Sequence, residues 1–259
     1  MNRIFVFSFF ICYFLFFISS FSQHYFLEIK FASPSDVSEN ENKIISKLSY
    51  KKTFVTKLER DKEIQNVLLS LYDDAYLTAD VENKIKDEKD SLKETVFLNP
   101  GRQYQWATLK KGNTNEGILS EVGYREKFFY NKPFYFKEIK KLQEKILIYC
   151  ENNGYPFASV KLDSIVISEN LLSASLNLRK NNLIKIDSIV NYGSAKISQT
   201  YFHNYFGIKP NDLYNESLVR KIGTRISDLP FAKEKIPFRV LFADEKARIE
   251  LFLEKKRVS

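Results

Sequence analysis

The side chains that most often carry out chemistry in proteins are scarce and scattered in this chain. Its 259 residues include two histidines, His24 and His203, and two cysteines, Cys12 and Cys150. Neither histidine has neighbours at the spacing of a metal site, and no HExxH, CxxC, GxSxG, Walker or dinucleotide-binding motif is present. The many carboxylates form no recognisable catalytic pair. We therefore expect a protein without enzymatic activity, metal or cofactor.

The first 22 residues have the pattern of a secretory signal peptide. A basic residue, Arg3, precedes an apolar run from Ile4 to Ile18 that contains one polar residue, Ser8, and the small residues Ser20 and Ser22 follow. This pattern predicts cleavage after Ser22. Counted to Phe21, however, the apolar stretch approaches the roughly 18 residues that span a bilayer, so an uncleaved anchor stays open. With either outcome the rest of the chain is exported.

The charge and cysteine content exclude two further classes of protein. The 40 Lys and Arg residues and 32 Asp and Glu residues are interleaved, so the net charge of +8 forms no basic stripe for nucleic acid. Cleavage would remove Cys12 and leave Cys150 without a partner for an intrachain disulfide. The helical apolar pattern around Cys150 predicts a small buried side chain.

Beyond the signal peptide at 1–22, the chain repeats one pattern of elements three times. Each repeat is expected to run strand, helix, helix, strand, strand, and we name the repeats the first, second and third modules: 23–102, 103–182 and 183–259. The predicted fold is therefore α+β, with each module formed by a three-stranded sheet covered by two helices.

The third module carries the clearest local signals. Residues 184–192 alternate apolar and polar side chains, as a half-buried strand does. Two apolar alternations on either side of residues 244–246 predict a closing hairpin. Between them stand residues that begin and end helices or turn the chain: the N-cap Ser198, the C-cap Gly207, the turn residue Pro210 and the N-cap Asn215.

The second module is expected to contain a short first helix over 116–127 and a long second helix over 134–153. Gly154 follows the long helix where a left-handed residue would redirect the chain into the next strand. The apolar residues of the long helix recur at helical spacing and predict one buried face: Phe136, Ile139, Leu142, Ile146, Tyr149 and Cys150.

The first module is expected to open with a strand over 25–31, whose residues alternate apolar and polar. The charged run from Lys84 to Asp90 is interpreted as a solvated hairpin loop between the last two strands. The long helix of this module is predicted to bury a set of aliphatic residues: Leu58, Ile64, Val67, Leu68 and Leu71.

Two segments resemble steps of a known family, the POTRA domains. GYPFASV at 154–160 resembles the family's GY-x-x-A-x-V passage from helix to strand, and GIKPNDLY at 207–214 resembles its link between the two helices. Ala75 stands where the first module would carry the glycine. The ordered combination resembles the periplasmic arm of a BamA/TamA-like outer-membrane assembly protein. The resemblance implies a non-enzymatic arm in the periplasm, associated with the outer membrane.

The resemblance also implies the partners of the chain. They would be unfolded outer-membrane protein clients, accessory periplasmic or lipoprotein subunits, and the outer membrane itself through a C-terminal β-barrel that lies outside this sequence. We therefore interpret the chain, which ends at Ser259, as a fragment of a longer protein, with a stand-alone arm as the alternative.

In the family the second strand of each sheet forms an edge that can receive an extended client by strand addition. Lys161 and Asp163 fit equally well as charges that deter aggregation of an exposed edge. A proline at either of these two positions is expected to remove an edge donor while the fold survives. The candidate edge residues of the second module are Val160, Lys161, Leu162, Asp163 and Ile165.

The alternative function is a membrane-anchored periplasmic scaffold of the cell-division type. It would retain residues 4–21 as a membrane span and would need one such module, so the three repeats favour the assembly arm. The N-terminal residue of the exported protein distinguishes the two, because cleavage gives Gln23 and an anchor keeps Met1.

Overall fold

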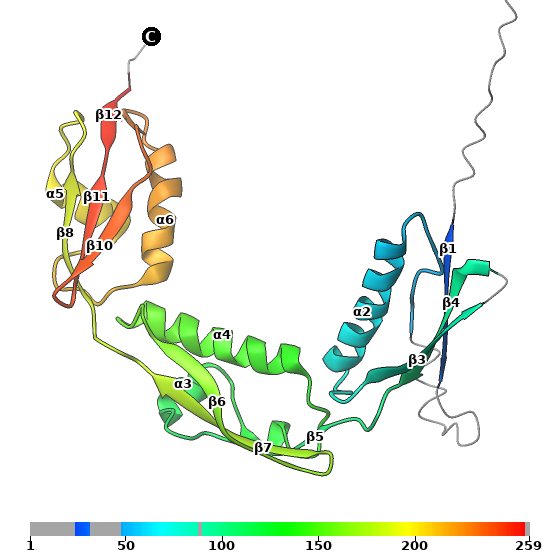
Figure 1. The fold of residues 1–259 in the computed structure, drawn as a ribbon. Helices are drawn as coiled ribbons and strands as arrows, with labels where there is room; N and C mark the ends of the chain where they lie inside the picture. Colours follow the sequence, from blue (N-terminus) through cyan, green and yellow to red (C-terminus); the bar gives the residue numbers. More distant parts are fainter. Residues whose placement is uncertain (1–23, 32–47, 88–89, 257–259) are drawn as a thin grey trace, which may run out of the picture. The chain divides into compact units, whose positions relative to one another are not determined.

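The computed structural model describes residues 24–31, 48–87 and 90–256 (Figure 1). The predicted signal peptide and the first helix expected in the first module lie outside these residues. The chain divides into two compact units, which are described separately. One unit holds residues up to 69 together with 79–99, and the other holds 70–78 together with 100–259.

The first unit is built on a sheet in the strand order β2-β1-β4-β3. β1 pairs with β4 in parallel, and β3 and β4 form an antiparallel hairpin. The α2 helix packs beside this sheet (Figure 1). The short β2, which pairs with Tyr25 and Phe26, adds a fourth strand that the sequence pattern does not predict. The elements are β1 (Tyr25–Phe31), β2 (Thr53–Phe54), α2 (Lys57–Asp73), β3 (Asp80–Asp87) and β4 (Asp90–Asn99).

Apolar residues from the sheet and from α2 form the core of this unit. Buried side chains come from both layers: Leu27, Phe54, Ile64 and Val96. An ion pair between Arg60 of α2 and Glu94 of β4 is also buried. One expectation is wrong, because Leu58 is 64% exposed. It lies in the first turn of α2, outside the part of the helix that contributes to the core.

The charged run from Lys84 to Asp90 was expected to be a loop, and this expectation is wrong. β3 continues to Asp87 and β4 begins at Asp90, so most of the run lies in the hairpin strands. Lys84 pairs with Val96 and Lys86 with Glu94. Backbone pairing with β4 therefore decides the structure here, although the side-chain composition is typical of a loop.

In the second unit, the second module has a sheet in the order β5-β7-β6. β5 runs parallel to β7, and β6 and β7 form an antiparallel hairpin, with α4 along one face of the sheet (Figure 1). Trp106 is fully buried between the sheet and the aromatic rings of Phe129 and Phe134. The elements are β5 (Gln105–Lys110), α3 (Glu116–Glu121), η2 (Glu126–Phe128), α4 (Phe136–Asn152), β6 (Ser159–Ser168) and β7 (Leu171–Arg179).

Two expectations for the second module need correction. The helix expected over 116–127 is broken into α3 and the 3₁₀ turn η2, because Gly123 takes a positive φ of 76° that ends the first piece. Phe136 is 55% exposed rather than buried, because it is the first residue of α4 and precedes the core-facing turns. Ile139, Ile146 and Cys150 are buried as predicted.

The third module has the strand order β10-β11-β8 and a separate two-stranded ribbon of β9 and β12. Ser198 and Asn215 cap α5 and α6 with their side chains, as the sequence predicts. The ribbon is not predicted. The elements are β8 (Lys185–Asn191), α5 (Gln199–Phe206), α6 (Glu216–Ser227), β9 (Ala232–Glu234), β10 (Arg239–Ala243), β11 (Lys246–Leu251) and β12 (Leu253–Lys255).

Candidate functional site

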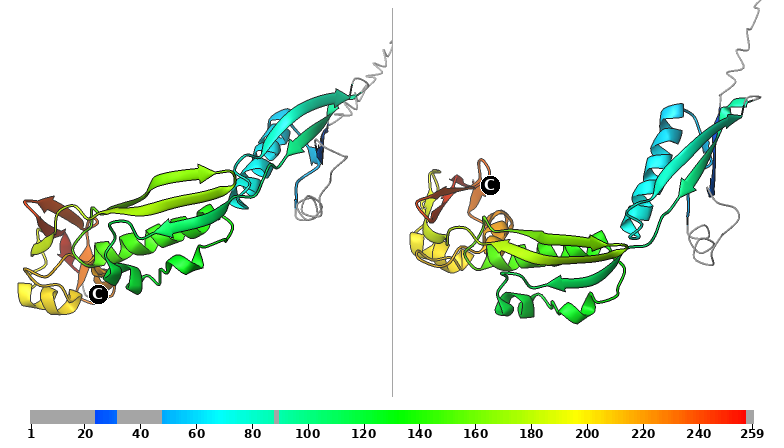
Figure 2. Two further views of the ribbon diagram at one scale, coloured as in Figure 1. Left: turned by 90° about the horizontal axis from the view of Figure 1, so that it is seen from below. Right: turned by 60° about the horizontal axis from the view of Figure 1, so that its bottom comes forward.

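The candidate strand β6 lies at one edge of the sheet in the second module. β7 occupies the middle position, with β5 on one side and β6 on the other (Figure 2). Within the described part of this sheet, β6 therefore has one neighbour, and its other side is open. Val160, Lys161 and Leu162 pair with Leu178, Asn177 and Leu176 of β7.

Hydrogen bonds of β7 determine which backbone groups of β6 face the open side. The side chain of Asn113, which follows β5, accepts from the N–H of Leu178 at 2.7 Å and donates to its C=O at 3.0 Å. Both backbone groups of Leu178 thus point away from β6. Because this direction alternates along an antiparallel strand, Asn177 turns its N–H and C=O towards Lys161.

The open side of β6 is therefore formed by the N–H and C=O groups of Val160 and Leu162. The donors of Lys161 and Asp163 face inward to β7, so the expectation that a proline at either position removes an open-edge donor is wrong. Such a proline would instead delete a ladder hydrogen bond. The Lys161 side chain is exposed, and Val160 and Leu162 are half-buried against the module core.

Asp163 organises a β-bulge that interrupts the edge. Its carboxylate accepts from the Asn177 amide at 2.6 Å and from the Ser164 N–H at 2.7 Å. These two hydrogen bonds hold the pKa of Asp163 below its ordinary value. Ser164 has a φ of 51°, and the pairing register shifts between Asp163 and Val166. Asp163 therefore stabilises the bulge through its hydrogen bonds, in addition to placing a charge at the edge.

Ile165 lies within this bulge and has no pairing partner in the strand register. It begins a run of three aliphatic side chains, Ile165, Val166 and Ile167, which are 54%, 62% and 54% exposed. Charged residues usually protect an edge strand from unwanted pairing, and this stretch carries none. The distal half of β6 therefore presents an apolar surface beside an open edge.

The three candidate turn residues lie at the ends of helices or between them. Gly154 follows α4 with a φ of 89°, and Gly207 ends α5 with a φ of 67°. Pro210 is exposed in the turn between α5 and α6, just before Asn211, whose φ is 69°. None of the three contributes to the open side of β6.

Sequence reasoning missed two features beside β6. Asn113, which fixes the direction of the strand, is 65 residues from Leu178 in the sequence, and no local pattern connects them. Phe157, two residues before β6, packs edge-to-face on Phe242 of β10 with ring centroids 4.8 Å apart. Phe157 lies within the GYPFASV segment, and its aromatic side chain beside a predicted strand was the available sequence signal for such a contact.

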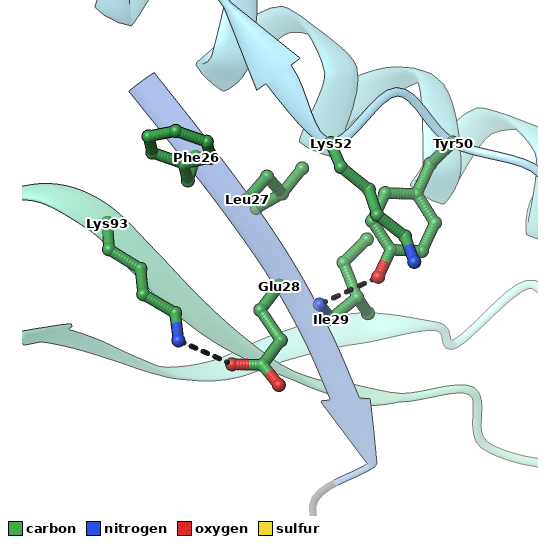
Figure 3. Close-up of a pocket in the computed structure, with 7 residues that line it drawn as sticks. All are labelled: Phe26, Leu27, Glu28, Ile29, Tyr50, Lys52 and Lys93. Carbon is green, nitrogen blue, oxygen red and sulfur yellow. Dashed lines mark hydrogen bonds and ion pairs between the residues drawn. The ribbon is translucent and has the colours of Figure 1, made fainter. Parts of the chain in front are cut away.

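An open cleft of about 490 Å³ lies beside β1 in the first unit (Figure 3). Its carboxylate, Glu28, lies 3.5 Å from Lys93 and 3.4 Å from Lys30. Burial opposes ionisation, but these lysines hold the pKa of Glu28 below its ordinary value. The Tyr50 hydroxyl is occupied in accepting from the Ile29 N–H. The carboxylate of this cleft is therefore already paired with two lysines, and the third lysine, Lys52, lies over the Tyr50 ring. This arrangement does not form an acid–base couple.

Metal sites and membrane-spanning helices are both absent from the described residues, 24–31, 48–87 and 90–256. No group of three or more His, Cys, Asp or Glu side chains is arranged to hold a metal ion there. Within the same ranges, no helix has the length and apolar character needed to cross a membrane.

No family model matches the sequence, and no curated protein does. Solved structures with a similar fold include POTRA domains 3–5 of BamA from Haemophilus influenzae, which are 13% identical, with 92% of this chain and 99% of that chain aligned at a TM-score of 0.50. POTRA domains 1–3 of Omp85 from Anabaena are 11% identical over 90% of this chain and 95% of that chain, at a TM-score of 0.38.

The fold assignment rests on the BamA comparison, which spans nearly the whole of both chains. The chain has the α+β fold of these POTRA domains. The likeness inferred from the two sequence segments is thereby confirmed at the level of the fold.

Proposed function

We propose that this chain is a periplasmic arm that assists the assembly of outer-membrane β-barrel proteins by capturing extended client segments along β6. The observation that carries the proposal is the open side of this strand. Val160 and Leu162 direct unpaired ladder groups outward, and exposed aliphatic side chains continue the same edge beyond the bulge. An extended peptide satisfies such an edge by adding one more strand.

The proposed clients are unfolded outer-membrane proteins, which are rich in segments of alternating apolar and polar residues. Accessory periplasmic or lipoprotein subunits are the other proposed partners, and the proposed location is the periplasm beside the outer membrane. The similarity in fold to BamA POTRA domains supports this assignment. A C-terminal barrel outside this sequence would supply the attachment to the membrane.

The decisive experiment compares two substitutions at one position. Leu162→Pro removes the outward donor and the leucine side chain, whereas Leu162→Ala removes only the side chain. Binding of the full chain to a fluorescent peptide from a barrel strand is measured by polarisation. Because a backbone hydrogen bond contributes about 1 kcal/mol, the proline variant should bind about fivefold more weakly than the alanine variant.

Thermal melting of both variants provides the control for folding. Lys161→Pro provides a second control, because its donor faces β7 and its loss should lower the melting temperature. Equal affinity of the Leu162→Pro and Leu162→Ala variants, with both folded, would contradict strand addition at this edge.

A further inference from the structure

The second and third modules meet at a joint built from backbone hydrogen bonds. The N–H of Ile184, at the start of the third module, donates to the C=O of Gly154 at 2.8 Å. The N–H of Gly154 donates in turn to the C=O of Tyr214 at 2.9 Å, and the N–H of Tyr214 donates to Ile184 at 3.0 Å. The first two bonds cross from one module to the other, and the third, within the third module, holds their two partners together.

Two asparagines extend this joint to the ends of the helices. Asn215, the N-cap of α6, donates through its side-chain amide to the C=O of Asn152 at 3.0 Å. The side-chain oxygen of Asn152, the last residue of α4, accepts from the N–H of Ser217 at 2.9 Å. The last carbonyls and first N–H groups of a helix lack partners within the helix. Each module therefore completes the helix end of the other.

The turn at Ala75 has part of the same backbone joint but lacks the reciprocal capping. Ala75 matches Gly154, and its C=O accepts from the N–H of Tyr104 at 2.7 Å, as Gly154 accepts from Ile184. At that turn, however, the N-cap of α4 is Tyr135, whose side chain makes no capping bond. The N–H of Ala75 donates to Tyr72 within its own module, whereas that of Gly154 crosses to Tyr214. The repeated fold thus supplies only part of the main-chain joint, and the two asparagine caps are particular to the joint between the second and third modules.

Aromatic packing closes the same joint from another side. Phe242 of β10 contacts Phe157 at 4.8 Å between ring centroids and Tyr214 at 5.3 Å. A side chain at Gly154 would lie 2.7 Å from the Leu183 side chain and 3.4 Å from the Ile184 carbonyl oxygen, so the third module packs closely against Gly154. Hydrogen bonds to both helix ends and an aromatic contact therefore constrain the relative rotation of the modules.

We propose that the second and third modules move as one rigid body, locked by the reciprocal caps of Asn152 and Asn215. Displacing one module would uncap the C-terminus of α4 and expose the N–H of Ser217 at the same time. The lock also holds Phe157, next to the edge strand β6, against Phe242 of β10. The open edges of the two modules are then presented in a fixed arrangement.

The experiment measures a distance distribution across the joint by double electron–electron resonance. Spin labels are attached to cysteines replacing the exposed Lys140 of α4 and Lys221 of α6, in the full chain with Cys12→Ser and Cys150→Ala. The parent should give one narrow distribution. The double variant Asn152→Ala with Asn215→Ser should give a distribution at least twice as wide, because serine still caps α6 but is too short to reach α4.

Asn153→Ala is the matched control, because the side chain of Asn153 bonds to Tyr149 within the second module. It should leave the distribution unchanged. Emission from Trp106 and the melting curve verify that each variant is folded. If the double variant melts below the assay temperature, Asn152→Ala alone carries the test. A wide distribution in the parent, or an unchanged one in the folded variants, would overturn the proposal.

Discussion

Replacing Gly154 with alanine tests how tightly the joint is packed. Gly154 has a φ of 89°, a region that costs an L-residue about 1–2 kcal/mol. The new methyl group would also lie 2.7 Å from a methyl of Leu183, and moving that side chain off its rotamer costs about 0.5–1.5 kcal/mol. We therefore expect Gly154→Ala to lower the free energy of unfolding by about 1.5–3.5 kcal/mol.

Gly123→Ala provides the matched control. Gly123 also has a positive φ, 76°, but an added methyl group there would meet nothing within 4 Å. It should therefore lose only the conformational part, about 1–2 kcal/mol. Unfolding in denaturant is followed through Trp106, the single tryptophan of the chain, which is buried in the second module. If Gly154→Ala costs no more than Gly123→Ala, the close approach of Leu183 does not constrain the joint.

Two further predictions concern charged groups. Burial and the nearby Glu216 raise the pKa of Glu151 above its ordinary value of 4.5, so the folded state binds this proton more tightly and loses stability as pH rises above that value. Glu151→Gln should therefore be more stable than the parent at neutral pH, and the difference should shrink as denaturation is measured towards pH 4.5. Glu94→Ala should destabilise the first unit by up to about 3–5 kcal/mol, because the buried Arg60 would lose its buried partner and keep only Asp61, whose side chain is 40% exposed. Hydrogen exchange of α2 should report this loss, and Arg60→Met combined with Glu94→Leu should recover most of it.

The elements that the sequence predicts best are those with local chemical signals at both ends. Ser198 and Gly207 mark the ends of α5, and Asn215 marks the start of α6, because capping and left-handed backbone depend on the residue itself. Helical periodicity alone was less reliable. It assigned Leu58 and Phe136 to buried faces, although each lies in a first helical turn that extends past the core.

The direction of the ladder groups on β6 could not be predicted from the sequence. Alternation along a strand predicts which side chains share a face, but it leaves open which backbone groups face a neighbour. That choice depends on Asn113, which engages Leu178 from a position 65 residues away. The family resemblance therefore indicated this strand as the edge, where the structure has it, but the outward donors were assigned to Lys161 and Asp163.

The bulge at Ser164 sets a limit on any strand that adds to β6. Between Asp163 and Val166 the strand advances three residues while its partner moves two, from Ser175 to Ser173. The extra residue in β6 reverses which residues direct their backbone N–H and C=O groups to the open side. Before the bulge these are the even-numbered Val160 and Leu162, and after the bulge it is Ile167. A regular client strand can therefore follow the edge from Ser159 only as far as Asp163. Beyond that point it must carry a matching irregularity or leave the backbone ladder, and the exposed aliphatic side chains then offer apolar contact instead.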